Sequence, residues 1–237
     1  MRLTAAILPI GLVALFTSLV AIPATADDKL PEPTRAEHQR SQNNLKQIGL
    51  AFHIHHDSIG NLPNNTYTKD GKALLSWRVL ILPYIEQEQL YKQFKLDEAW
   101  DSETNKPLIA KMPKLYAPIR VKAKEGETFY RGFAGKGALF GPDAGKGLKL
   151  SSITDGTSNT GLVFEAGEAS IWTKPDDMAF DLKKPLPKLG GLFDGRSNVV
   201  MCDGSVRRLK KDPDETELKK LIGYGDGEVL DLDKLTK

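Results

Sequence analysis

The spacing of hydrophobic residues changes near position 115 of the chain. Before this point Leu45, Ile48 and Phe52 recur at helical spacing, whereas after it short β-type runs are separated by Gly, Asp, Asn and Pro. Helices gathered ahead of strands are typical of an α+β fold, because βαβ winding requires the two to alternate along the chain. The sequence therefore predicts an α+β domain.

The first and longest helix has recognisable ends. Thr34 and Glu37 have the spacing of a capping box, and Gly60 follows the last hydrophobic positions. We therefore expect a helix from about residue 35 to Asp57. Three further helical stretches are expected: Tyr84–Phe94 after Pro83, Glu103–Lys111, and Asp214–Ile222 with Gly223 at its C′ position.

The β-type runs of the second part are short and contain β-branched or aromatic residues. The last two runs flank Asp203-Gly204, a pair that favours a two-residue type I′ hairpin turn because both positions need positive φ. We expect strands at Leu115–Arg120, Thr128–Phe133, Thr160–Ala166, Asn198–Cys202 and Ser205–Leu209.

Residues 1–26 have the three parts of a secretory signal peptide, namely Arg2, an uncharged apolar run and the triplet Ala24-Thr25-Ala26. Cleavage between Ala26 and Asp27 leaves a flexible lead-in over residues 27–34 and a single domain over residues 35–237. An uncleaved membrane anchor is the alternative, although the apolar stretch is short for a bilayer and contains Pro and Gly. We expect a periplasmic or secreted protein with no membrane span after leader removal.

Charge and cysteine content exclude a non-specific nucleic-acid binder and a domain held together by internal disulfides. The chain has 33 Lys+Arg and 31 Asp+Glu, a net charge of +2, so it lacks the strongly basic surface of a non-specific nucleic-acid binder. Cys202 is the only cysteine, so the chain forms no internal disulfide even in an oxidising compartment. Its stability must come from packing.

Three sequence blocks carry a resemblance to a known family: Asn43–His53 (NNLKQIGLAFH), Ser76–Gln87 (SWRVLILPYIEQ) and Ile153–Thr160 (ITDGTSNT). In this order they resemble the exported family called domain of unknown function 1559, which is abundant in planctomycete bacteria. The resemblance covers about residue 35 to the C-terminus. It implies a pseudopilin-like fold in which a long N-terminal helix packs on an antiparallel sheet with long loops.

The chain departs from the usual members of this family at two places. A secretory leader stands where they carry a prepilin-like leader that runs directly into a hydrophobic helix. Their signature also places a His ten residues before Asp203, where this chain has Phe193. The chain therefore lacks the hydrophobic N-terminal block through which such members enter a filament. It also lacks the signature His, because Phe193 stands at that position.

Two of the four histidines suggest a metal site. On a helix, His53, His56 and Asp57 fall on one face at i, i+3 and i+4, which permits convergence on one ion. The alternative is that this face packs on the sheet, where an imidazole commonly bonds to a backbone carbonyl. A fourth ligand cannot be named. A bound cofactor is therefore not expected, with a transition metal or Ca²⁺ as the open alternative.

Other motifs favour structural roles. Gly156–Gly161 misses the G-x-S-x-G nucleophile elbow by one residue, so Asp155, Gly156 and Asn159 are expected to form a turn, with a Ca²⁺ loop at Asp155 as the alternative.

The glycine segment Gly135–Gly147 matches no phosphate-binding pattern, and we expect a mobile surface loop. Cys202 is expected to be buried rather than nucleophilic. Spaced aromatics are expected in the core, with a sugar or peptide groove as the alternative: Trp77, Trp100, Trp172, Tyr84, Tyr91 and Tyr130.

These observations favour an exported, non-enzymatic protein that acts by binding or assembly at the cell envelope. Its expected partner is an envelope or secretion-system protein, and neither nucleic acid nor a membrane is expected as a partner. An extracytoplasmic solute- or carbohydrate-binding module is the alternative. Aromatic side chains converging on a concave pocket would favour that alternative, whereas a flat apolar patch would favour assembly.

Overall fold

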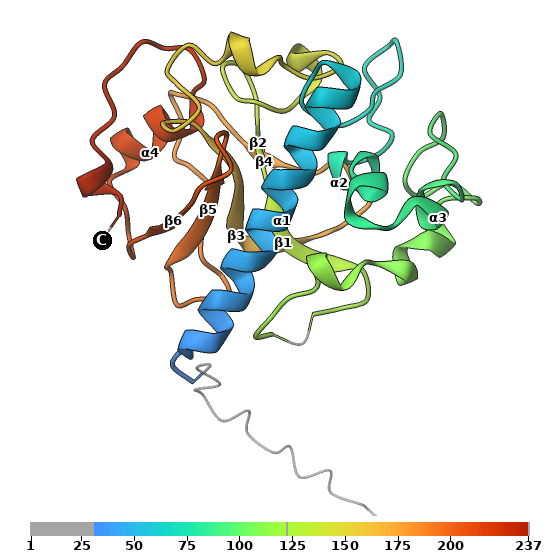
Figure 1. The fold of residues 1–237 in the computed structure, drawn as a ribbon, viewed down its shortest axis with the longest axis horizontal. Helices are drawn as coiled ribbons and strands as arrows, with labels where there is room; N and C mark the ends of the chain where they lie inside the picture. Colours follow the sequence, from blue (N-terminus) through green and yellow to red (C-terminus); the bar gives the residue numbers. More distant parts are fainter. Residues whose placement is uncertain (1–30, 122, 237) are drawn as a thin grey trace, which may run out of the picture. The chain divides into compact units, whose positions relative to one another are not determined.

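Helix α1 (Arg35–Ile59) packs on one face of the central sheet in the computed structural model, which describes residues 31–121 and 123–236 (Figure 1). Its start is the predicted capping box, in which the side chains of Thr34 and Glu37 each bond the backbone N–H of the other. Its end is Gly60, whose φ of 88° only glycine adopts readily. The predicted long N-terminal helix is therefore confirmed, whereas the signal peptide predicted over residues 1–26 lies outside the described residues.

The central sheet is antiparallel, with strand order β1-β3-β5-β6. Its strands are β1 (Glu127–Arg131), β3 (Gly161–Ile171), β5 (Ser197–Met201) and β6 (Val206–Leu209). Together with α1 it confirms the predicted α+β class. A separate parallel pair, β2 (Phe133–Ala134) with β4 (Met178–Ala179), was not expected from the sequence.

The sheet is covered on both faces. Val200 and Val163 belong to the cluster that packs under α1, whereas their neighbours Val199 and Phe164 belong to a second cluster with α4 (Glu215–Ile222). Side chains alternate between the two faces of a strand, which explains why all five residues of β5 are buried. By its internal contacts, the chain from Glu32 to Lys237 forms one compact unit.

The connection between α1 and β1 is made of short helical pieces. The helix expected over Tyr84–Phe94 is divided into a 3-10 turn at Leu82–Ile85 and α3 (Glu88–Tyr91), separated at Glu86, which has a φ of 60°. They follow α2 (Trp77–Leu80), and the expected Glu103–Lys111 helix is a 3-10 helix at Lys106–Lys111.

The strand predicted at Leu115–Arg120 is wrong. The chain there begins in a 3-10 turn at Lys114–Tyr116 and forms no strand. Tyr116 is fully buried, stacks on Trp172 with ring centroids 5.9 Å apart, and donates its hydroxyl hydrogen to the carbonyl of Arg78 at 3.0 Å. Apolar residues at this position therefore fill the core without pairing to another strand.

The hairpin turn between β5 and β6 differs from the predicted type. Gly204 has a φ of 81°, but Asp203 is not among the residues with positive φ, so the turn is not type I′. The Gly204 N–H donates to Met201 O at 2.9 Å, and the Met201 N–H donates to Ser205 O at 2.8 Å. These bonds enclose a three-residue loop whose last residue is the left-handed glycine, a type I turn with a G1 bulge. Gly223, expected at the C′ position of the last helix, follows α4 in an extended conformation with a φ of −64°, and its N–H donates to Lys219 O.

Candidate functional site

A buried ion pair joins Arg78 to Asp177 within a network of polar contacts. The Arg78 guanidinium of α2 is 3.8 Å from the carboxylate of Asp177, in the segment that leads into β4, and both side chains are fully buried. Two opposite charges without solvent stabilise the fold only when their remaining hydrogen-bonding positions are filled.

Arg78 fills its positions with backbone and side-chain oxygens. Its Nε donates to Tyr130 O at 2.8 Å, Nη2 bonds the same carbonyl, and Nη1 donates to Ser76 Oγ at 2.7 Å. The guanidinium also stacks 4.5 Å above the Trp77 ring. Burial lowers the pKa of Arg78 to about 10, while the charge of Asp177 opposes that shift, so the side chain stays cationic at neutral pH.

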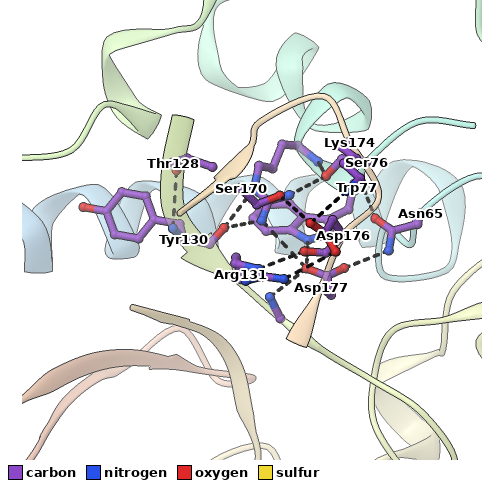
Figure 2. Close-up of polar contacts among 12 residues, drawn as sticks. Asn65, Ser76, Trp77, Thr128, Tyr130, Arg131, Ser170, Lys174, Asp176 and Asp177 are labelled. Carbon is purple, nitrogen blue, oxygen red and sulfur yellow. Dashed lines mark hydrogen bonds and ion pairs between the residues drawn. The ribbon is translucent and has the colours of Figure 1, made fainter. Parts of the chain in front are cut away.

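Asp177 connects three segments that are distant in the sequence. Its carboxylate accepts hydrogen bonds from Asn65 Nδ2 at 2.7 Å, Trp77 Nε1 at 3.2 Å and the Gly132 N–H at 2.9 Å (Figure 2). The neighbouring Asp176 instead forms ion pairs with Arg131 and Lys174. We define Asn65, Trp77, Arg78 and Asp177 as the polar framework.

The polar framework supports a cavity of about 590 Å³. The cavity lies among the C-terminal end of α1, the segment Asn64–Gly71 and the loop Pro142–Lys146. Asn65 belongs to both the framework and the cavity wall, since the residue lines the cavity while its Oδ1 accepts the Trp77 N–H at 3.1 Å. The framework thus fixes one wall of the cavity.

Asn64 fixes the wall formed by the loop Pro142–Lys146. Its Nδ2 donates to Gly141 O and Gly145 O, both at 2.9 Å, and its Oδ1 accepts the Gly141 N–H at 3.2 Å. The glycine segment Gly135–Gly147, which we expected as a mobile surface loop, is therefore anchored to the first half of the chain at these positions. Such pre-formed walls are typical of small-molecule sites.

Two ionisable rings line the cavity. His55 Nδ1 is 2.9 Å from Asn61 O, and burial lowers the pKa of His55, so the ring is neutral near pH 7 with its proton on Nδ1. Tyr67 Oη accepts a hydrogen bond from Asn65 Nδ2 at 3.4 Å, and burial raises the pKa of Tyr67. His55 Nε2 and the Tyr67 hydroxyl hydrogen have no partner among the described residues.

A second buried polar cluster lies between α1 and the sheet. Glu165 of β3 is completely buried and accepts hydrogen bonds from Ser41 Oγ, from the Asn198 N–H at 2.7 Å and from Asn198 Nδ2 at 3.0 Å. Tyr130 Oη lies 3.1 Å from Ser41 Oγ. Burial raises the pKa of Glu165 to about 7, partly offset by these hydrogen bonds.

The histidines predicted as metal ligands have protein neighbours. His56 Nε2 accepts the Leu150 N–H at 3.3 Å, and His56 Nδ1 is 3.6 Å from Asp57 Oδ1. His53 Nε2 is buried without a hydrogen-bond partner among the described residues, and its ring lies beside Gly204. Within residues 31–121 and 123–236, no group of three or more His, Cys, Asp or Glu side chains is placed to hold a metal ion.

The predicted turns at Asp155–Asn159 and Asp203-Gly204 form hydrogen bonds to other segments of the C-terminal half. Gly156 has a φ of 94°, and Asn159 Nδ2 donates to Asp155 O at 3.0 Å. The Asp155 carboxylate accepts the N–H groups of Asp226 and Gly227, both at 2.9 Å. The N–H of Asp203 reaches back to Thr157 O at 3.0 Å, so the two turns are in contact.

The candidate nucleophiles and most of the large aromatic side chains have structural surroundings. Cys202 is buried, and burial raises the pKa of its thiol. Ser158 is exposed, and no hydrogen bond joins a histidine to a Ser, Thr or Cys side chain in the part of the chain that the structure describes. Trp77, Trp172 and Tyr130 lie in the core and do not form a groove.

Some of these features were not predicted from the sequence. Asp177, Glu165 and Asn64 carry the buried polar contacts, yet none stands in a recognisable pattern. Arg78 and Trp77 lie within the block Ser76–Gln87, and that block was the only signal that pointed to this region.

The fold and the site define an α+β protein in which a buried polar framework supports a ligand-sized cavity beside the end of a long helix. Residues 38–137 match the model of a family described as "Protein of unknown function (DUF1559)". This match supports the resemblance to the family that the sequence blocks indicate. The matched segment contains the first two sequence blocks, whereas Ile153–Thr160 lies beyond it. No curated protein and no solved structure matches the chain.

Proposed function

We propose that the protein is an exported, non-enzymatic protein that binds a small molecule at the cell envelope. The cavity beside α1 carries this proposal. Its walls are fixed by Asn64 and Asn65, while His55 and Tyr67, which also line it, each keep an unused hydrogen-bonding group. Rigid walls with a few open polar groups are what a binding site for a small ligand requires.

Two observations support the non-enzymatic and exported parts of the proposal. His55 and His56 bond backbone groups and His38 stacks on Phe193, and a serine or cysteine nucleophile with an adjacent base is missing among the described residues. Export to the periplasm or the medium rests on Arg2, the apolar run and Ala24-Thr25-Ala26. No helix within the described residues is long and apolar enough to cross a bilayer.

The proposal is tested on protein purified from its native envelope. Native mass spectrometry should show a population heavier than the chain by the mass of one small molecule, and the mature N-terminus should be Asp27. The variant Ile59→Trp, which fills the cavity mouth from an exposed position, should lose the extra mass. Intact Met1 protein in the cytosol would contradict export, and ligand-free protein from every preparation would contradict binding.

Assembly with an envelope or secretion-system protein is the second candidate function. It is favoured by Leu50 and Ile54, which lie one turn apart on α1 and are 60% and 39% exposed. Large apolar side chains on the outer face of a helix are suited to packing against a partner. Cross-linking in the envelope should then trap a partner with the wild type and not with Leu50→Gln/Ile54→Gln.

A further inference from the structure

We infer that the cavity beside α1 binds a small hydroxylated carboxylate. This inference rests on the proposed binding function and adds the chemical class of the ligand. It follows from three properties of the lining: the sign of its charges, its apolar residues, and the hydrogen-bonding groups that the protein leaves open.

The charged groups that line the cavity are all positive. Lys69 and Lys146 stand on two different loops that line the cavity, both are exposed, and neither ammonium has an ion-pair partner among the described residues. The acids of the same loops, Asp70 and Asp143, do not line the cavity. Two cations without a facing carboxylate create a positive potential at the mouth, which attracts an anion.

Part of the lining is apolar. Ile59, Leu80 and Pro142 line the cavity, and Ile59 at the end of α1 is 61% exposed. Covering such a side chain with an apolar ligand surface is favourable by ~25 cal/mol per Å². An inorganic ion alone would leave this surface in water, so the anion should have an organic body.

The open hydrogen-bonding groups indicate a hydroxyl on that body. The amides of Asn64 and Asn65 are already used within the protein. His55 Nδ1 donates to Asn61 O, so Nε2 is left as an acceptor, and the Tyr67 hydroxyl is left as a donor. Ligand hydroxyl groups complement both side chains, because a hydroxyl can donate to His55 Nε2 and can accept from the Tyr67 hydroxyl.

The cavity volume of about 590 Å³ limits the ligand to the size of a small metabolite. A sugar acid and a hydroxylated aromatic acid share the required carboxylate, hydroxyl and apolar face. The experiment therefore uses one of each, glucuronate and 4-hydroxybenzoate, and pairs them with neutral compounds of the same shape, glucose and 4-hydroxybenzyl alcohol.

Affinities are measured by calorimetry on the full purified chain at low and moderate salt. At least one carboxylate should bind about ten-fold more tightly than its neutral counterpart, equivalent to ~1.4 kcal/mol. That binding should weaken as salt rises. The identity of the carboxylate that binds distinguishes a sugar acid from an aromatic acid.

Matched lysine variants locate the binding. Lys69→Gln/Lys146→Gln should reduce carboxylate affinity about ten-fold. Lys72→Gln/Lys149→Gln changes the same charge at exposed positions close by that do not line the cavity, and it should bind like the wild type. His55→Asn is expected to weaken binding at both salt concentrations, because it removes the acceptor at Nε2.

Failure of this inference is distinguishable from failure of the proposed function. Equal affinity for the neutral compounds, lost in Ile59→Trp but unchanged in Lys69→Gln/Lys146→Gln, would overturn the carboxylate assignment and keep small-molecule binding. The carboxylate assignment also fails if neither acid binds. Binding unchanged in both the Ile59→Trp and the double lysine variant would overturn the site itself.

Discussion

The guanidinium of Arg78 lies 3.8 Å from the carboxylate of Asp177, and neither side chain is exposed to solvent. This pair joins the block Ser76–Gln87 to a segment about 100 residues later, and Asp177 also bonds Asn65 at the wall of the cavity. Loss of the ion pair should therefore affect both the stability of the core and the shape of the cavity.

Removing one partner should be strongly destabilising. Asp177→Ala leaves Arg78 as a buried, uncompensated charge and removes three hydrogen bonds, so the free energy of unfolding should fall by about 3–5 kcal/mol. Denaturant unfolding measures the change. The control is Glu88→Gln, which breaks an exposed pair with Lys92 and should cost less than ~1 kcal/mol. Equal losses in the two variants would refute the structural role of the buried pair.

Local patterns predicted the elements whose cause is local. The capping box at Thr34 and the left-handed Gly60 set the ends of α1, and both depend on residues within one turn. The region after Leu115 shows the limit of such reasoning, because Tyr116 is apolar enough for a strand but stacks on Trp172, which is distant in the sequence.

The candidate site was less predictable than the fold. Asp177 and Glu165 are isolated acids in the sequence, and acids are normally exposed. Only the folded chain shows that Asp177 meets Arg78 and that Glu165 meets Ser41 and Asn198. Burial of a charged group depends on long-range packing, which periodicity does not report.

Gly49 provides a test of how closely α1 approaches the sheet. A Cβ at this position would lie 2.7 Å from Val200 Cγ2, closer than packed carbon atoms approach. Alanine favours a helix over glycine by ~1 kcal/mol, but the clash should outweigh this gain. We expect Gly49→Ala to lower the melting temperature, and to lower it less in a Val200→Ala background than in the wild type, because the shortened side chain removes the clash. A more stable single variant would show that α1 can move away from β5 at little cost.

Two substitutions in the hairpin turn test its type by whether they raise or lower the stability of the fold. Gly204 has a φ of 81°, so Gly204→Val should cost about 1–3 kcal/mol through backbone strain. Asp203→Gly should also destabilise, by ~1 kcal/mol, because it removes the hydrogen bond from the Ser205 N–H to Asp203 Oδ1. In a type I′ turn, glycine at position 203 would instead relieve strain. Stabilisation by Asp203→Gly in a urea titration would therefore refute the three-residue loop.

Glu165 should make stability depend on pH. Its pKa is raised from 4.5 to about 7 in the folded state, so the folded protein holds this proton more tightly than the unfolded chain. The resulting stabilisation is fully present below pH 4.5 and is lost as pH rises through 7, by up to about 3 kcal/mol.

Glu165→Gln isolates this effect, because Gln is neutral, keeps an acceptor for Asn198, and replaces the oxygen that accepts from Ser41 Oγ with an N–H group that can donate to it. Urea unfolding at pH 5 and pH 8 should give a smaller difference for the variant than for the wild type. Identical pH differences in the two proteins would show that Glu165 stays ionised in the fold.

The last prediction separates a structural role of the α1 histidines from metal binding. In the double variant His53→Gln/His56→Gln, the Gln carbonyl at position 56 can still accept the Leu150 N–H, so the free energy of unfolding should change by only ~1 kcal/mol. Asp57→Asn should be nearly neutral, because this side chain is exposed. A metal site predicts instead that wild-type protein contains a stoichiometric ion, that the double variant lacks it, and that chelator lowers the melting temperature of the wild type to that of the variant. Elemental analysis and thermal unfolding of the same samples measure both quantities, and a bound ion lost with the two imidazoles would establish His53, His56 and Asp57 as ligands.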